Sequence, residues 1–230
     1  MDHQSEPWVQ RLRDGVVPPL WPFVAGALGL FAVAVAVLVV EARFVDQASL
    51  TGRGSVAVLL PLLGAVGCVV APISAWRDGR RDRRALRHAH GHGRGRPAFH
   101  LPVSARGTIA GQDLPDPRIA LVTVDRSGLL GWSPVSPDPV VTIPWTHVAR
   151  IDLATKDHRG RREDYGLWLT LTDGGTFVLE PRSALGRPFS ATQPRLGVLR
   201  DVLRALRPGS GPGSRPGSGS GSAGRRGAPR

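Results

Sequence analysis

The sequence is poor in several residue types that carry out chemistry in proteins. Cys68 is the only cysteine among 230 residues, so the chain forms no disulfide within itself, and its apolar surroundings predict a buried, unreactive thiol. Lys156 is the only lysine, and no glycine-rich stretch carries the lysine that a phosphate-binding loop requires. Zinc-ligand spacings, nucleophile elbows and paired carboxylates are also missing. We therefore expect no catalytic residue, no cofactor and no metal site.

Charged residues are missing from two long stretches, 20–40 and 55–76. Each stretch has roughly the 20 apolar residues that an α-helix needs to cross the core of a bilayer. Trp21 and Trp76 stand at ends of these stretches, where indole rings favour the headgroup layer. Two buried helices of a soluble protein are the alternative. We predict two transmembrane helices, joined by a short extracytoplasmic linker, 41–54.

Basic charge is concentrated directly after the second apolar stretch. The chain has a net charge of +12, and eight arginines, three histidines and only two aspartates fall between Arg77 and Arg96. Short basic flanks of membrane helices stay on the cytoplasmic side. The sequence therefore predicts a multi-pass protein of the cell membrane with both termini in the cytoplasm. Its N-terminal segment is 1–19, and its basic juxtamembrane linker is 77–97.

This arginine cluster is the first candidate site. An anionic inner leaflet attracts basic residues that lie within about one Debye length of its surface. Nucleic acid is the weaker interpretation, because no aromatic residue interleaves the arginines. We expect lipid headgroups to contact six residues of the cluster: Arg77, Arg80, Arg81, Arg83, Arg84 and Arg87.

Three alternating histidines, His88, His90 and His92, lie in the same segment. In an extended chain their side chains would share one face, and imidazole suits zinc, nickel or copper. Neither a carboxylate nor a cysteine stands nearby to complete a metal site, and the surrounding glycines indicate a flexible linker. We favour a histidine-rich linker over a metal site.

The pattern changes after residue 98 to short segments in which apolar and polar residues alternate, as in β-strands. The predicted strands lie within 101–110, 118–125, 128–132, 139–143, 148–154 and 166–180, the last being a hairpin that turns at Asp173-Gly174-Gly175. A helix follows, with Thr192 at its cap, Pro194 in its first turn and leucines at helical spacing. The segment 98–207 therefore predicts a barrel or sandwich of about seven strands closed by a C-terminal helix. Residues 208–230, rich in glycine, serine and proline, predict a disordered tail.

This order of strands and terminal helix resembles the pleckstrin-homology (PH) superfold. The residues that carry the resemblance are Ile143, Pro144, Trp145, Val148 and Ile151, which look like a segment of bacterial PH-like domains. The whole chain is similar to small bacterial membrane proteins that contain such a domain, and the resemblance implies binding or scaffolding without catalysis. Phosphoinositide-binding members carry basic residues around their first loop. The corresponding loop, 111–117, carries Asp113 and Asp116, so we expect no inositol-phosphate pocket there.

A second basic cluster lies at 156–164. Contact with a partner or an anion is expected of Lys156, Arg159, Arg161 and Arg162, since guanidinium groups suit phosphate and carboxylate. A solvated hairpin loop is the alternative, because three acidic residues partly neutralise the cluster. The function predicted is a non-catalytic, membrane-anchored scaffold for an unidentified protein partner. The alternatives are a module that binds anionic lipid surfaces and an accessory subunit of a larger membrane complex.

Overall fold

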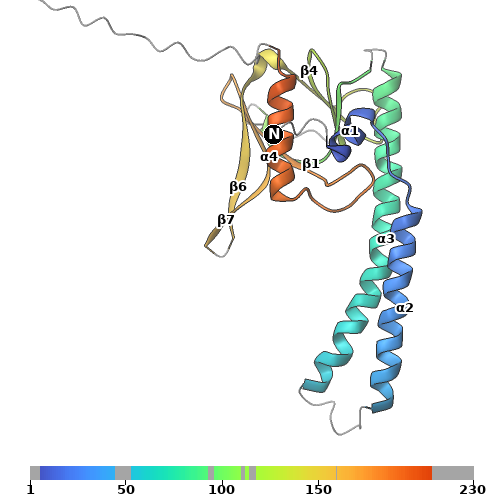
Figure 1. Cartoon of the computed structure of the whole chain (residues 1–230). Coiled ribbons are helices and arrows are strands. Elements are labelled where there is room, and N and C mark those ends of the chain that lie inside the picture. Colours follow the sequence, from blue (N-terminus) through green and yellow to red (C-terminus); the bar gives the residue numbers. More distant parts are fainter. Residues whose placement is uncertain are drawn as a thin grey trace, which may run out of the picture.

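The computed structural model describes residues 6–44, 53–92, 96–109, 112–113, 118–158 and 160–208. Its elements follow the chain in this order: α1 (Pro7–Asp14), α2 (Trp21–Phe44), α3 (Arg53–Gly91), β1 (Phe99–Ile109), β2 (Gln112–Asp113), β3 (Leu121–Val124), β4 (Gly128–Trp132), β5 (Val141–Pro144), the 3-10 helix η3 (Trp145–His147), β6 (Val148–His158), β7 (Arg161–Leu171), β8 (Thr176–Pro181) and α4 (Gln193–Leu206). Two long helices extend away from a β-rich domain, as Figure 1 shows. The protein is therefore an α+β structure, as predicted.

The strands form one antiparallel sheet with the order β5-β4-β3-β1-β8-β7-β6, and β2 pairs only with β1. The long strand β1 belongs to both halves of this sheet, because Phe99–Pro102 pairs with β3 and Val103–Gly107 pairs with β8. The edge strands β5 and β6 do not pair with each other among the described residues. The sheet is therefore open: of the predicted barrel or sandwich of about seven strands, the structure shows the antiparallel strands and their number but no closure between β5 and β6 among the described residues.

The predicted hairpin of 166–180 is confirmed. Strand β7 ends at Leu171 and β8 begins at Thr176. Gly174 has a φ of +83°, which favours glycine, and the Asp173 carboxylate accepts a hydrogen bond of 2.8 Å from the Gly175 amide. The turn residues in the sequence thus fix the register of these two strands.

The hairpin considered for 156–164 is present and exposed, but its loop is shorter than the sequence suggested. Strands β6 and β7 continue through it as a paired ribbon, with Lys156 opposite Glu163 and Asp157 opposite Arg162. Gly160, with a φ of +76°, lies in the turn, and its amide donates to the Asp157 carboxylate at 3.1 Å. Opposite charges across the two strands favour this extension.

The predicted C-terminal helix is confirmed as α4. It packs on β6 and β7 and buries four side chains: Leu196, Leu199, Val202 and Leu203. Arg204 donates to the Ile151 carbonyl at 2.6 and 3.0 Å, and Arg207 donates to the Ala149 carbonyl at 3.1 Å. The helix therefore covers the sheet and also occupies carbonyl groups of its edge strand β6.

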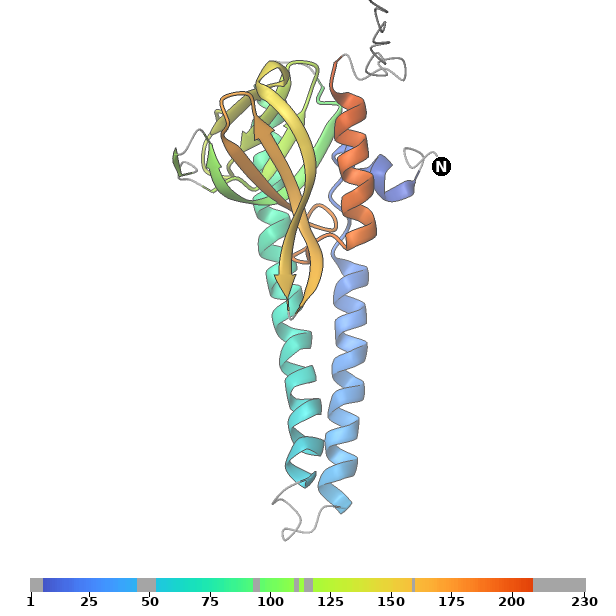
Figure 2. The ribbon, with the colours of Figure 1, turned by 90° about the vertical axis from the view of Figure 1, so that its left-hand side faces the viewer.

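Helices α2 and α3 pack side by side and extend away from the sheet (Figure 2). Among the described residues, one helix has the length and composition to cross a bilayer: the stretch Trp21–Val40 of α2 has a mean hydropathy of 2.8, and none of it is buried in the protein. The second predicted span, 55–76, lies in α3, and the side chains of its first residues lie outside the described part. The transmembrane pair therefore stays a prediction.

The flexible linker predicted for 77–97 is wrong for Arg77–Gly91. Helix α3 continues without a break from the apolar stretch through the arginine cluster. The structure also adds the helix α1, which the sequence interpretation missed. Its Val9 and Leu12 are buried, and it packs on β1. Both α1 and the end of α3 are therefore parts of the domain.

Candidate functional site: the arginine face of helix α3

The basic half of α3 has two faces. Asp82, Ala85, Leu86 and Ala89 recur every three or four residues and are buried, where α3 contacts β3 and β4. The opposite side carries the six arginines that the sequence singled out, and all six are exposed: Arg77, Arg80, Arg81, Arg83, Arg84 and Arg87. Helical spacing thus divides the cluster into a docking face and an arginine face.

Asp82 fixes this half of α3 to the domain. Its carboxylate accepts hydrogen bonds from Arg182 Nη2 at 2.5 Å and from the Gly186 amide at 2.6 Å. Burial raises the pKa of the Asp82 carboxyl above its ordinary value of 3.8, and Arg182 opposes part of that rise. The close approach needs glycine, because a Cβ on Gly186 would lie 3.3 Å from the Gly79 Cα and 3.0 Å from Val17.

The arginine face has little internal neutralisation. Arg81 lies 4.0 Å from Asp78, and the guanidinium of Arg80 lies 4.0 Å above the Trp76 ring. Among the described residues, no carboxylate forms an ion pair with Arg83, Arg84 or Arg87. Like charges three and four residues apart destabilise a helix by a few tenths of a kcal/mol per pair. This face therefore favours an external anion.

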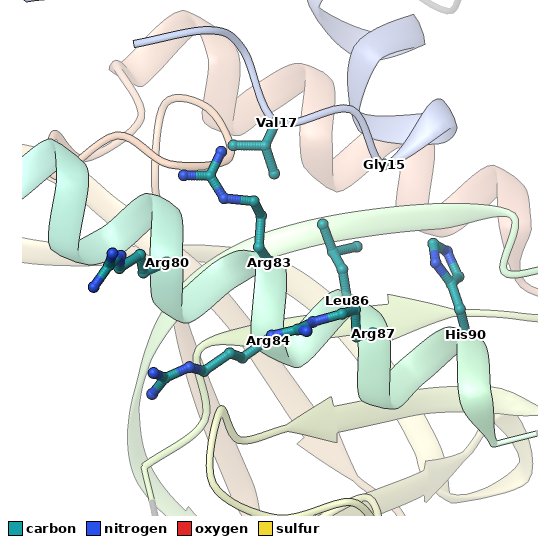
Figure 3. A pocket seen from close by; sticks show the side chains of 8 residues that line it. All are labelled: Gly15, Val17, Arg80, Arg83, Arg84, Leu86, Arg87 and His90. Carbon is teal, nitrogen blue, oxygen red and sulfur yellow. The ribbon is translucent and has the colours of Figure 1, made fainter.

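A groove of about 680 Å³ runs beside the arginine face, between α3 and the segment that joins α1 to α2. Arg83, Leu86 and His90 point toward Gly15 and Val17 on the far wall of the groove (Figure 3). A second row of residues on α3 borders the groove and points along the helix: Arg80, Arg84 and Arg87. The groove is therefore basic at one end, apolar in its middle and lined by an imidazole at the other end.

The three histidines that raised the alternative of a metal site have separate partners. Nδ1 of His88 donates a hydrogen bond to the Ser133 carbonyl at 3.2 Å. The His90 ring packs edge-on against the His100 ring, with 5.5 Å between the ring centroids. The His92 ring packs against the Trp132 ring, with 5.4 Å between the ring centroids. His88 and His90 lie on α3, and His92 directly follows it. Because a helix points successive side chains in different directions, the three imidazoles do not share one face, as they would in an extended chain. No group of three metal-ligating side chains occurs in the described part of the chain.

His100 is a residue of this region that sequence reasoning missed. It is fully buried on β1, and its Nδ1 donates to the Leu12 carbonyl of α1 at 3.1 Å. Its Nε2 is buried without a hydrogen-bond partner. Burial lowers the pKa of His100 below its ordinary value of 6.5, and His90 and Arg96 lower it further. Nothing in the sequence around His100 predicts its hydrogen bond to α1.

The second basic cluster forms the end of the β6–β7 hairpin. Lys156, Arg161 and Arg162 are exposed there, and Arg159 lies outside the described residues. This end of the hairpin points in the direction in which α2 and α3 extend, and it reaches the level at which α2 begins (Figures 1 and 2). The hairpin therefore points toward the end of the domain from which the long helices extend. Loop 111–117 lies outside the residues whose side chains are described.

Comparison of the chain with family models, with curated proteins and with solved structures finds no match. The function is therefore argued from the site. Exposed guanidinium groups donate several hydrogen bonds in a fixed plane and suit phosphate or carboxylate groups.

Proposed function

We propose that this protein is a membrane-anchored, non-catalytic binding protein that presents a PH-like domain at the cytoplasmic face of the membrane. The observation that carries this proposal is the continuity of α3. One helix joins the apolar stretch to the domain, and the buried Asp82–Arg182 pair locks it there. A domain held in this way has a fixed height and orientation relative to the bilayer.

The PH-like assignment rests on the strand order and the position of α4. Seven antiparallel strands pair in the order β5-β4-β3-β1-β8-β7-β6, and the terminal helix covers β6 and β7. Trp145 and Ile151, from the segment that carries the resemblance, are buried in the core. The indole of Trp145 donates to the Asp125 carbonyl at 2.9 Å, which positions the short helix η3 between the two edge strands.

The continuous helix supports lipid contact by only the first arginines of the cluster. With a rise of about 1.5 Å per residue, Arg77 to Arg81 lie within about 8 Å of Trp76 along the axis, which matches the thickness of one headgroup layer. Arg87 begins about 16 Å beyond Trp76. We therefore assign headgroup contact to Arg77, Arg80 and Arg81, and no longer to the cluster as a whole.

Recognition of anionic lipid is the second candidate function, favoured by the β6–β7 hairpin. Its basic end reaches the level at which α2 begins (Figures 1 and 2), so Lys156 would meet the headgroups together with the first arginines of α3. A basic residue near an anionic leaflet contributes on the order of 1 kcal/mol, and salt weakens this attraction.

Cys68, the only cysteine, provides the test of membrane anchoring. It lines the hollow between α2 and α3. In intact membranes, a charged maleimide should fail to label Cys68 until the protein is denatured. The matched control is Val135→Cys in a Cys68→Ser background, because residue 135 is 68 % exposed in the domain. Equal labelling of both proteins would reject the anchoring.

Lys156, the only lysine, provides the test of lipid contact. The full chain in nanodiscs is treated with an amine-reactive reagent, and peptide mass spectrometry separates Lys156 from the N-terminal amine. Labelling of Lys156 should be slower in anionic than in zwitterionic nanodiscs, and salt should restore the rate. Equal rates in both lipids would show that the hairpin does not meet the headgroups, and would leave the anchoring intact.

A further inference from the structure

The groove between α3 and the α1–α2 segment has a shape and chemistry that the proposed lipid contact does not use. Arg83 points across the groove toward Val17, and Leu86 and His90 point to the same side one and two turns further on (Figure 3). Under the proposed function α3 is anchored in the bilayer, and Arg83 then lies about 10 Å beyond Trp76. The part of the groove from Arg83 to His90 therefore lies above the headgroup layer, and only Arg80, at its rim, reaches that layer.

The dimensions of the groove exclude a single small anion as its complement. Arg83 and His90 are seven residues apart on one helix, which separates them by about 10 Å along the axis. Leu86 and Val17 line the space between them. One phosphate group cannot contact both ends, and it gains nothing from the apolar middle. The volume of about 680 Å³ suits an elongated ligand.

The charges of the groove select the chemical class of that ligand. Arg83 has no carboxylate partner among the described residues, and Arg80, Arg84 and Arg87 add three positive charges at the rim. Single-stranded nucleic acid is disfavoured, because the described lining holds no Phe, Tyr or Trp on which a base could stack, and its one aromatic ring, the His90 imidazole, already packs against His100. Carboxylates that flank an apolar side chain satisfy both the basic end and the apolar middle.

We propose that this groove binds an extended acidic segment of a partner protein, with a carboxylate at Arg83 and an apolar side chain against Leu86 and Val17. This inference rests on the proposed function, since it names the partner of the anchored domain. Charge complementarity excludes the C-terminal tail of this chain as the occupant, because residues 209–230 carry arginines and no acidic residue.

The binding test uses the full chain in zwitterionic nanodiscs and a fluorescent octapeptide of alternating glutamate and leucine. Arg83→Gln should weaken binding roughly tenfold, because it removes the charge that points into the groove. Arg84→Gln is the matched control, with the same loss of charge at the next residue, and should weaken binding by about threefold or less. Replacing leucine by serine in the peptide should also weaken binding to the wild-type protein.

Four results would overturn the inference. Equal losses for Arg83→Gln and Arg84→Gln would indicate attraction to charge alone, and equal binding of the serine peptide would indicate that the apolar middle is unused. Tighter binding of oligothymidylate would identify a nucleic-acid site. Competition by anionic lipid that Arg83→Gln abolishes would identify a headgroup site. Repeating the assay in detergent micelles separates this inference from the anchoring, because the groove does not need a bilayer to bind the peptide.

Discussion

The two halves of α3 belong to one helix but have different surroundings. In the half before Arg77, large apolar side chains such as Val66, Val70 and Ile73 are more than half exposed. In the half from Arg77 to Gly91, arginines are exposed and a stripe of small and apolar residues is buried against the sheet. An apolar outside suits lipid, and a charged outside suits water. Under the proposed anchoring, the surface of the bilayer lies near Trp76.

Among substitutions that test this difference between the two halves, Asp82→Ala is expected to lower the free energy of unfolding most. The variant removes the carboxylate that pairs with the charge of Arg182 and accepts from the Gly186 amide, and breaking a buried ion pair in this way costs about 3 to 5 kcal/mol. The free energy of unfolding of the full chain in micelles, measured with urea, should fall by that amount.

Asp78→Ala is the control for this measurement, because the Asp78–Arg81 pair is long and lies on an exposed side of the same helix. Its cost should be well below 1 kcal/mol. If the two variants were equally stable, the basic half of α3 would not be docked through Asp82.

A smaller effect is expected from Ala85→Leu. Ala85 is fully buried among the core residues of the domain, so a larger side chain overpacks the contact and costs about 1 to 3 kcal/mol. Val70→Leu is the matched substitution in the other half, where the side chain is 55 % exposed and can expand into lipid or detergent. Thermal unfolding should separate the two variants. Equal destabilisation would show that both halves of α3 pack against protein.

The strands and the terminal helix follow from local signals in the sequence. Period-two alternation, the turn residues Asp173 to Gly175, and the leucines of α4 each specify a local geometry with few alternatives. The openness of the sheet could not be predicted in this way. It depends on whether β5 and β6 meet, which is decided by long-range packing and not by any local pattern.

The main error of the sequence interpretation was that it ended the second apolar helix before the arginine cluster. The pattern that predicts a continuous helix was present in the sequence. Asp82, Ala85, Leu86 and Ala89 have helical spacing, but the glycines around the histidines suggested a flexible linker. Gly79 lies within the helix, at the point where Gly186 approaches α3. A buried aspartate among arginines indicates a docking contact only when the arginine on the other element is known.

The smallest expected effect concerns His100, which joins α1 to the sheet beside the basic half of α3. Burial keeps its pKa below the ordinary value of 6.5, so the unfolded chain takes up a proton on this group before the folded protein does. Stability should therefore fall as the pH drops below 6.5, and this contribution should level off below the pKa of the folded state.

His100→Gln removes the titrating group and should flatten this part of the pH profile of the free energy of unfolding. The contribution of Asp82 is common to both proteins and cancels in their difference. If His100→Gln retains the full slope of the wild type, the imidazole is accessible to protons in the folded state, and α1 does not seal it.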